Sequence, residues 1–182
     1  MKLPLHSFAG TALLLLFLLL SSCAGIRPGS SAAARSLYTT FMVEDRGLQY
    51  FIKPLRFTSK DGEELLMDIT FRYRDELAGD ANYKFSYTGK TLTKELHEVR
   101  FENPLGTWTA GEVDFMFVER EGKNFQSRQE TLLPLAATKQ LFSSPDWSIR
   151  IIGPEGFSQT FLPRSNTRRA ITRLNHHIFE LF

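Results

Sequence analysis

The residue best placed to do chemistry in this chain is Cys23, its only cysteine. Cys23 follows an apolar run from Ala12 to Leu20, and Lys2 supplies a positive charge ahead of that run. A short basic start, an apolar core and small residues before a cleavage point are the three parts of an export signal. The apolar run is well short of the roughly 20 residues that a transmembrane helix needs. We therefore predict that residues 1–22 are a signal peptide that is cut off.

The tetrapeptide Leu20-Ser21-Ser22-Cys23 resembles the lipobox of bacterial lipoprotein precursors, in which Leu and two small residues precede the cysteine. The resemblance implies that Cys23 begins the mature chain. Its sulfur would receive a diacylglyceryl group, and its freed amine would receive a further acyl chain such as palmitate. Two or more chains make membrane attachment stable, whereas one holds a protein only marginally. In Gram-negative lipoproteins, Ala24 instead of Asp after the cysteine implies transfer to the outer membrane, so we expect a lipid-anchored domain facing the periplasm.

Ordinary secretion is the alternative that these residues leave open. Ser22 and Ala24 are small enough to flank a cut after Ala24, which would discard Cys23. Residues 24–35 hold too few large apolar groups to pack, so residues 23–35 are predicted to be an acylated N-terminus and a flexible tether. As a coil, such a tether holds a domain roughly 20 Å from the lipid on average.

The remaining chemical motifs are incomplete. Gly89-Lys90-Thr91 matches the end of a phosphate-binding loop, but Lys84 stands where that motif needs a glycine. His176 and His177 would point about 100° apart on a helix, which is a poor arrangement for binding a metal. His97 is expected in a strand, and no Gly-x-Ser-x-Gly elbow provides a serine nucleophile. We therefore expect no catalytic residue, metal or cofactor.

Carboxylates could in principle supply an acid and a base, as glycosidases require. The candidates fall in turns or on expected polar strand faces, where solvated carboxylates are the norm, so no catalytic pair is predicted. These candidates are Glu63, Glu64, Asp68, Asp75, Glu112 and Asp114.

Four arginines surround the start of the last predicted helix, namely Arg164, Arg168, Arg169 and Arg173. Cations there oppose the helix dipole, whose N-terminal end favours anions by about 0.3–1 kcal/mol. One interpretation is a solvated basic face with Asp or Glu partners in the same chain. The other is contact with anionic surfaces, either phospholipid or lipopolysaccharide headgroups or an acidic partner protein.

The length of the mature chain predicts one globular domain over residues 36–182. About 160 residues remain after cleavage, which is enough for one domain with a real core. Removing Lys2 from the 22 basic residues leaves 21 against 20 acidic ones, so net charge gives no argument for nucleic acid. Removing Phe8 and Phe17 from the 16 phenylalanines leaves 14, and aromatic side chains carry large buried areas.

Alternating apolar and polar residues predict a β-rich domain. The clearest strand alternates from Leu65 to Tyr73, and Ser59-Lys60-Asp61-Gly62 provides turn chemistry for a hairpin with the run Leu48–Thr58. A short helix is predicted from Leu135 to Phe142, after Pro134. The other predicted strands contain Tyr83 to Tyr87, Val99 to Phe101, Val113 to Phe117, Phe125 to Leu132, Trp147 to Ile151 and Phe157 to Leu162.

The end of the chain changes to a helical period. Ser165 or Asn166 can cap a helix, and apolar residues then recur three and four residues apart from Ala170 to Leu181. About eight strands and one amphipathic helix predict an antiparallel β-sandwich, or a partly closed barrel whose open side the helix covers. The function predicted is a membrane-anchored, non-catalytic accessory or binding domain. A carrier of lipid or another apolar ligand is the alternative, and a hydrolase of unrecognised type is the third.

Overall fold

The structure is a computed structural model that describes residues 36–43, 47–90 and 95–182. These residues all belong to one compact unit. Within them, no helix is both long enough and apolar enough to cross a membrane. Cys23, the predicted signal peptide and the predicted tether lie outside the described residues.

Ten strands and two α-helices make up the described part of the chain, with two short 3₁₀ turns, η3 and η4. In chain order the elements are β1 (Tyr38–Met42), β2 (Leu48–Ser59), β3 (Glu64–Tyr73), β4 (Asp80–Gly89), β5 (Glu98–Asn103), β6 (Gly106–Thr109), β7 (Val113–Glu121), β8 (Asn124–Pro134), α3 (Leu135–Phe142), β9 (Ser148–Ile152), η3 (Pro154–Gly156), β10 (Ser158–Pro163), α4 (Ser165–His177) and η4 (Phe179–Leu181).

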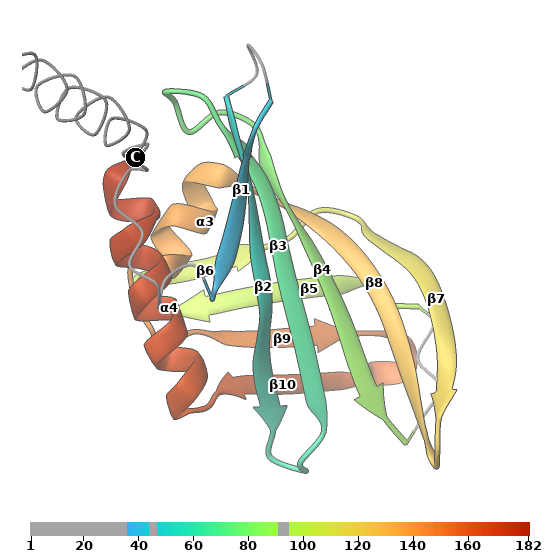
Figure 1. Cartoon of the computed structure of the whole chain (residues 1–182). Coiled ribbons are helices and arrows are strands. Elements are labelled where there is room, and N and C mark those ends of the chain that lie inside the picture. Colours follow the sequence, from blue (N-terminus) through green and yellow to red (C-terminus); the bar gives the residue numbers. More distant parts are fainter. Residues whose placement is uncertain (1–35, 44–46, 91–94) are drawn as a thin grey trace, which may run out of the picture. The chain divides into compact units, whose positions relative to one another are not determined.

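The strands form a single antiparallel sheet in the order β6-β5-β9-β10-β2-β3-β4-β8-β7, with β1 also paired to β2. The sheet curls into a half-barrel, and α3 and α4 lie together at one side of it (Figure 1). The prediction of a mainly β fold with a partly closed barrel and a C-terminal helix is confirmed. Two of the ten strands, β1 and β6, were not anticipated from the sequence.

Strand β2 is central to the curled sheet because it pairs with three strands. β3 lies along one side of it, while the other side pairs first with β1 and then with β10. The pairing with β3 shifts register between Ile52 and Leu55, at Pro54. Proline has no N–H to donate to a ladder, so a break at this position costs little. The break lets the two halves of β2 serve different neighbours.

The hydrophobic core fills the concave side of the sheet. The alternation predicted for β3 agrees with the burial of its side chains. Leu65, Met67, Ile69 and Phe71 are buried, and the residues between them are not. The hairpin before this strand turns at Gly62, whose φ of 84° lies in the left-handed region that glycine adopts without strain. Figure 1 shows the two helices beside this core.

The helices contribute aromatic and aliphatic side chains to the same core. Phe142 of α3 stacks on Phe179 of η4 with ring centroids 4.5 Å apart, and Phe142 also packs on the buried Trp147 at 5.4 Å. Ile171 and Leu174 of α4 are fully buried. The terminal helix therefore covers the open side of the half-barrel, as the sequence pattern predicted.

Strand β7 was predicted to contain Val113 to Phe117, and in the structure it is longer and has an irregular register. The register with β8 shifts between Phe115 and Phe117, so Met116 is an extra residue and the two phenylalanines occupy opposite faces. β7 is also the last strand in the order of the sheet, so only one of its edges pairs with another described strand. Phe115 and Phe117 are 43% and 44% exposed. The alternation of Val113, Phe115 and Phe117 from which this strand was predicted therefore does not place all three on one face.

Two local predictions also need correction. The N-cap of α4 is Arg164, which makes no side-chain capping hydrogen bond, so neither Ser165 nor Asn166 caps the helix. His97 is exposed and lies in a bend directly before β5, not within a strand.

Candidate functional site

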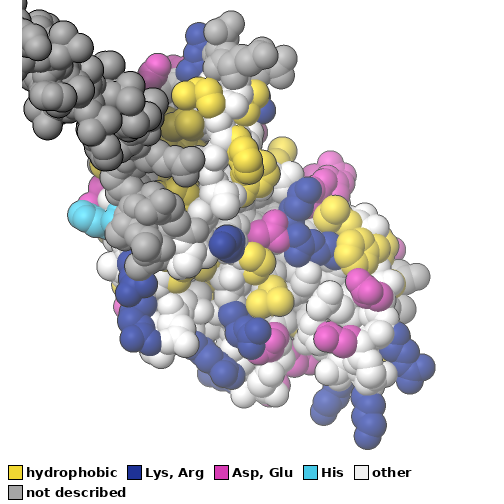
Figure 2. Space-filling model, viewed as in Figure 1, with side chains coloured by type: hydrophobic (Ala, Val, Ile, Leu, Met, Phe, Trp, Pro, Cys, Tyr) yellow, Lys and Arg dark blue, Asp and Glu magenta, His cyan; other side chains and the backbone are white. Residues whose placement is uncertain are grey.

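The candidate site is built on α4, whose two faces differ in chemistry. Thr167, Ile171 and Leu174 are buried, at the three- and four-residue spacing that places them on one face of a helix. The Thr167 hydroxyl donates to the Arg56 carbonyl at 2.5 Å and ties the helix to β2. Arginines therefore occupy the opposite face, and Figure 2 shows Lys and Arg side chains along the edge that α4 forms.

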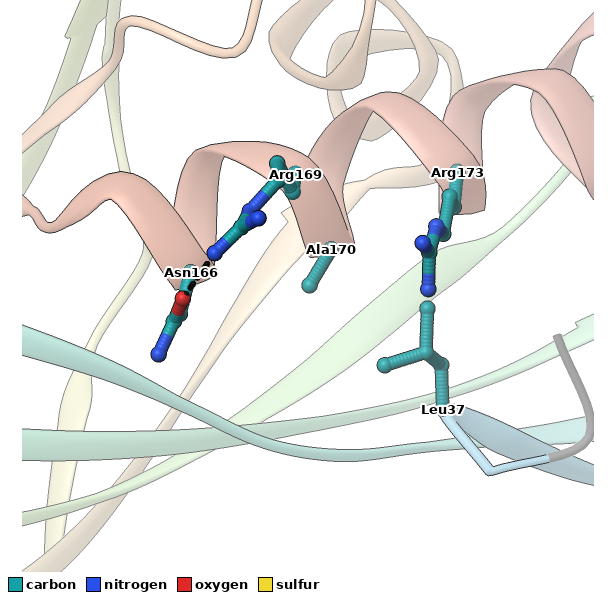
Figure 3. A pocket seen from close by; sticks show the side chains of 5 residues that line it. All are labelled: Leu37, Asn166, Arg169, Ala170 and Arg173. Carbon is teal, nitrogen blue, oxygen red and sulfur yellow. Dashed lines mark hydrogen bonds between the residues drawn. The ribbon is translucent and has the colours of Figure 1, made fainter. Parts of the chain in front are cut away.

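The start of the described chain lies against this basic face. Leu37 directly precedes β1, and its carbonyl accepts the Lys53 backbone N–H at 2.8 Å. Its side chain lines a shallow hollow of about 220 Å³, and Figure 3 shows the Arg173 guanidinium directed toward it. The other residues that line this hollow are Asn166, Arg169 and Ala170. The point at which the chain enters the domain is thus beside the arginines. We call this hollow and the residues that line it the junction site.

The four predicted arginines differ in their partners. Arg168 makes an ion pair with Asp146, with Nε and Oδ1 2.5 Å apart. Arg169 donates to the neutral Asn166 amide oxygen one turn earlier. Within the part of the chain that the structure describes, neither Arg164 nor Arg173 has an ion-pair partner. The interpretation of a basic face balanced by acidic partners therefore holds for one arginine of the four.

The local helix electrostatics leave this charge uncompensated. The first turn of α4 holds no acidic residue, although the N-terminal end of a helix favours negative charge. Arg169 and Arg173 lie four residues apart and so project from one face. A guanidinium offers several N–H donors in a planar fork that fits phosphate or carboxylate oxygens. The junction site can therefore bind an anionic group between two arginines, with Leu37 and Ala170 as apolar contacts.

The six candidate carboxylates do not form such a constellation. Glu63 accepts from the Tyr87 hydroxyl at 2.9 Å, Glu64 pairs with Arg56 at 3.1 Å, and Asp68 pairs with Arg128 at 2.5 Å. Each of these three thus has a separate partner. Asp75, Glu112 and Asp114 are exposed. Among the described residues, no group of three or more His, Asp or Glu side chains is arranged to hold a metal ion.

The two neighbouring histidines lie as expected from the helix geometry. His176 is exposed and its Nδ1 lies 2.9 Å from Glu180 Oε2, while His177 is half-buried. Their rings meet edge to face, with centroids 5.2 Å apart. Of the incomplete phosphate-loop match at Gly89-Lys90-Thr91, Gly89 ends β4 and Lys90 directly follows it, whereas Thr91 lies outside the described residues.

The two buried tyrosines of β4 carry the pKa shifts that matter for stability. Burial raises the pKa of the Tyr83 hydroxyl, which donates to Thr138 at 3.1 Å. Burial also raises the pKa of Tyr87, and the Glu63 carboxylate beside it acts in the same direction because a second negative charge there is unfavourable. Both hydroxyls therefore stay neutral at physiological pH and act as hydrogen-bond donors.

Sequence reasoning found the arginines but missed what lies beside them. Leu37 contributes to the junction site only because β1 pairs with β2 and brings the start of the described chain to α4. The run from Leu37 to Val43 is rich in apolar and β-branched residues, so its composition could have predicted a strand. Its contact with a helix 130 residues later was not detectable in a single sequence.

Comparison with known proteins provides no relative. No protein-family model matches the chain, and no curated protein or solved structure is significantly similar to it.

Proposed function

We propose that this chain is a lipid-anchored protein of the bacterial cell envelope, with a non-catalytic domain that rests on a membrane through the junction site. The observation that carries the proposal is the position of Leu37. The first described residues lie against Arg169 and Arg173, and Cys23 precedes Ser36 by a short tether. An anchor at Cys23 brings this side of the domain to the lipid. In this proposal the acylated Cys23 is held in an outer membrane, and the domain faces the periplasm.

The charge at the junction site supports contact with anionic headgroups. Arg173 has no ion-pair partner among the described residues, and Arg169 bonds only to a neutral amide. A Lys or Arg near an anionic membrane contributes about 1 kcal/mol, an effect that falls off within a Debye length. Arginines on the far side of the domain would contribute little, so their place beside the entering chain is the significant feature.

The interior supports a binding module over a lipid carrier. The concave side of the sheet is filled by large side chains with almost no exposure, and the hollow beside Leu37 is shallow and open to solvent. A carrier would need room there for an acyl chain. The largest of these side chains are Trp147, Tyr83, Phe57, Phe71, Phe85 and Phe101. Native mass spectrometry of the purified protein should therefore show no bound lipid beyond its own acyl groups.

The anchor is tested by Cys23→Ser in the full chain, expressed in bacteria fed a palmitate analogue. We expect the variant to lose acyl labelling, because no other cysteine is present, and to leave the membrane in a high-salt wash, because salt screens the remaining contact of the junction site. Ser21→Ala is the matched control, since it keeps a small residue at that position and should remain labelled. Retention of Cys23→Ser in the membrane fraction after that wash would contradict the proposal, as would release of the wild type into the medium.

The junction site is tested separately with a chain that begins at Ser31. The hydrophobic core lies between Tyr50 and Phe179, so this chain keeps all of it. It should float with phosphatidylglycerol vesicles but not with phosphatidylcholine vesicles. Arg169→Gln with Arg173→Gln should weaken that binding by roughly fivefold per arginine, from about 1 kcal/mol each.

A matched control separates position from net charge. Arg120→Gln with Lys123→Gln removes the same two charges from the β7–β8 hairpin, where both side chains are exposed. This control should bind as the wild type does. Equal weakening by both double variants would show that only net charge matters, and no binding by the wild type would remove the junction site from the proposal.

A further inference from the structure

A second feature beside the entering chain is an exposed apolar surface on the convex side of β1 and β2. Phe41 and Phe51 are 60% and 40% exposed, and we call them the aromatic patch. The rings of Phe41 and Phe51 meet edge to face, with centroids 5.7 Å apart. Their contact is with each other and not with the core. Figure 2 shows hydrophobic side chains gathered on the face where Figure 1 places β1 and β2 in front.

Register explains why Phe41 and Phe51 lie outside. Tyr38 is opposite the buried Ile52, and alternation then places Thr39, Phe41 and Phe51 on the convex face. A phenylalanine pair on the solvent face of a strand gains nothing from the fold's own core. Single exposed apolar residues are common on protein surfaces, but contiguous ones mark contact with a partner or a membrane.

A basic residue stands in the same row as this patch. Phe41 is opposite Gln49 in β2, and Gln49 is opposite Arg72 in β3. The Gln49 amide holds Arg72 in place, because its Oε1 accepts the Arg72 Nε at 3.2 Å while its Nε2 donates to the Phe71 carbonyl at 2.9 Å. Arg72 also lines a shallow hollow of about 240 Å³ with Arg74, Glu76 and Ala78. Apolar side chains beside a guanidinium are the combination that suits the boundary between acyl chains and headgroups.

The length of the tether determines which surface can meet the membrane. Tyr38, where β1 begins, is fifteen residues after Cys23, so it lies no more than about 54 Å from the anchor even if the chain is fully extended. β1 is the first element of the domain, and its five residues add only about 17 Å. The aromatic patch is therefore always within reach of the membrane that holds Cys23.

The other exposed apolar group suits a membrane less well. Phe115, Met116 and Phe117 of β7 are similarly exposed, but the same strand carries Asp114, Glu119 and Glu121 against Arg120 alone. An acidic strand is repelled by an anionic bilayer. β7 is also at the far end of the strand order from the β1–β2 pair.

We propose that Phe41 and Phe51 enter the interfacial region of the membrane that carries the anchor, with Arg72 on its headgroup phosphates. This inference rests on the proposed anchor at Cys23. The patch would then touch the bilayer together with the junction site, which it adjoins at the start of β1, and the domain would not swing freely on its tether.

The experiment uses the full chain, purified from bacterial membranes and reconstituted in phosphatidylglycerol and phosphatidylethanolamine vesicles. Phe41→Cys is labelled with an environment-sensitive fluorophore, and Phe117→Cys is the matched control on β7. Fluorescence at position 41 should shift to the blue and be quenched several-fold more by nitroxide lipids than fluorescence at position 117. The wild type should take up no label, because acylation leaves the chain without a free thiol.

The outcomes separate the two proposals. Label on Cys23 of the wild type would overturn the anchor, whatever happens at position 41. Quenching at position 41 no greater than at position 117, with the wild type unlabelled, would overturn the patch and leave the anchor standing. Arg72→Gln in the Phe41→Cys chain should reduce the quenching, and unchanged quenching would remove Arg72 from the contact.

Discussion

The ring of Phe182 stacks on the ring of Tyr73, with centroids 3.8 Å apart and planes inclined by only 8°. Phe182 also meets Phe179 edge to face at 5.9 Å. These contacts join the segment after α4 to the end of β3. Phe179 therefore belongs to the core, Phe182 packs against it, and both close the open side of the half-barrel.

Phe179→Ala should be among the most damaging substitutions in the domain. Phe179 is fully buried and packs on Phe71 and Phe142, with centroids 5.5 Å and 4.5 Å away. Replacing a buried phenylalanine with alanine costs about 3–5 kcal/mol, because apolar contact is lost and a cavity remains. Urea unfolding followed by circular dichroism measures this loss. Leu181→Ala, two residues later and 74% exposed, is the control and should change stability by less than about 0.5 kcal/mol. Equal effects of the two substitutions would contradict the packing described.

Alkaline pH should destabilise the domain through the two buried tyrosines of β4. The pKa values of Tyr83 and Tyr87 are raised above the ordinary value of 10.0 by burial. Above about pH 10 the unfolded chain releases these protons while the folded domain keeps them. The free energy of unfolding therefore falls as pH rises. Below that pH their contribution to stability is fully present. The measurement is the free energy of unfolding between about pH 8 and about pH 11.

Tyr83→Phe provides the control for this pH dependence. The variant loses the hydrogen bond to Thr138, which costs about 1 kcal/mol at neutral pH. It should nevertheless lose stability less steeply above pH 10 than the wild type, because one raised pKa is gone. A slope identical to that of the wild type would show that Tyr83 does not titrate with unfolding.

The parts of the fold that the sequence predicted well are those with a strong local pattern. Strand β3 alternates without interruption, and α3 has the bounds expected from Leu135 to Phe142. β6 is only four residues long and β1 buries little, so neither produced a clear period. The bulge at Met116 was missed for a different reason. A register shift is a property of two strands and leaves an apparently regular alternation in one of them.

The candidate site was only half visible in the sequence. The arginines of α4 stand out because basic residues at a helix start are electrostatically unfavourable. Their partners come from elsewhere in the chain. Asp146 pairs with Arg168 through the segment before β9, and Leu37 reaches Arg173 through β1. Long-range pairing decides such contacts, and no local pattern encodes them.

The ion pair between Arg128 and Asp68 should contribute measurably to stability. The arginine of β8 reaches across β4, donating to the Ser86 hydroxyl at 3.0 Å and to Asp68 of β3 at 2.5 Å. Both charged side chains are about three-quarters buried, at 21% and 24% exposure. A double-mutant cycle with Arg128→Gln and Asp68→Asn should give a coupling energy of about 1 kcal/mol, reduced by added salt.

An exposed pair on the same sheet provides the comparison for that cycle. Arg56 and Glu64 lie 3.1 Å apart, but their side chains are 58% and 38% exposed. Solvent screens such a pair, so Arg56→Gln with Glu64→Gln should show coupling near zero. Coupling in the exposed pair as large as in the Arg128–Asp68 pair would argue against burial as the cause.

Gly89→Ala should disturb the end of β4 even though alanine is only one methyl group larger. A Cβ at position 89 would lie 2.3 Å from the Tyr87 hydroxyl oxygen and 3.1 Å from the Glu63 carboxylate. The hydrogen bond of 2.9 Å between these two groups would have to break or move. We expect a loss of about 1–3 kcal/mol, as for other overpacked sites.

Two comparisons separate lack of space from other effects of the methyl group. At Gly79 a Cβ meets nothing within 4 Å, so Gly79→Ala lacks the steric clash, although the φ of 79° adds backbone strain. Tyr87→Leu combined with Gly89→Ala should show a smaller penalty for the alanine than Gly89→Ala alone. An equal penalty in both backgrounds would show that the tyrosine ring is not what excludes a side chain at position 89.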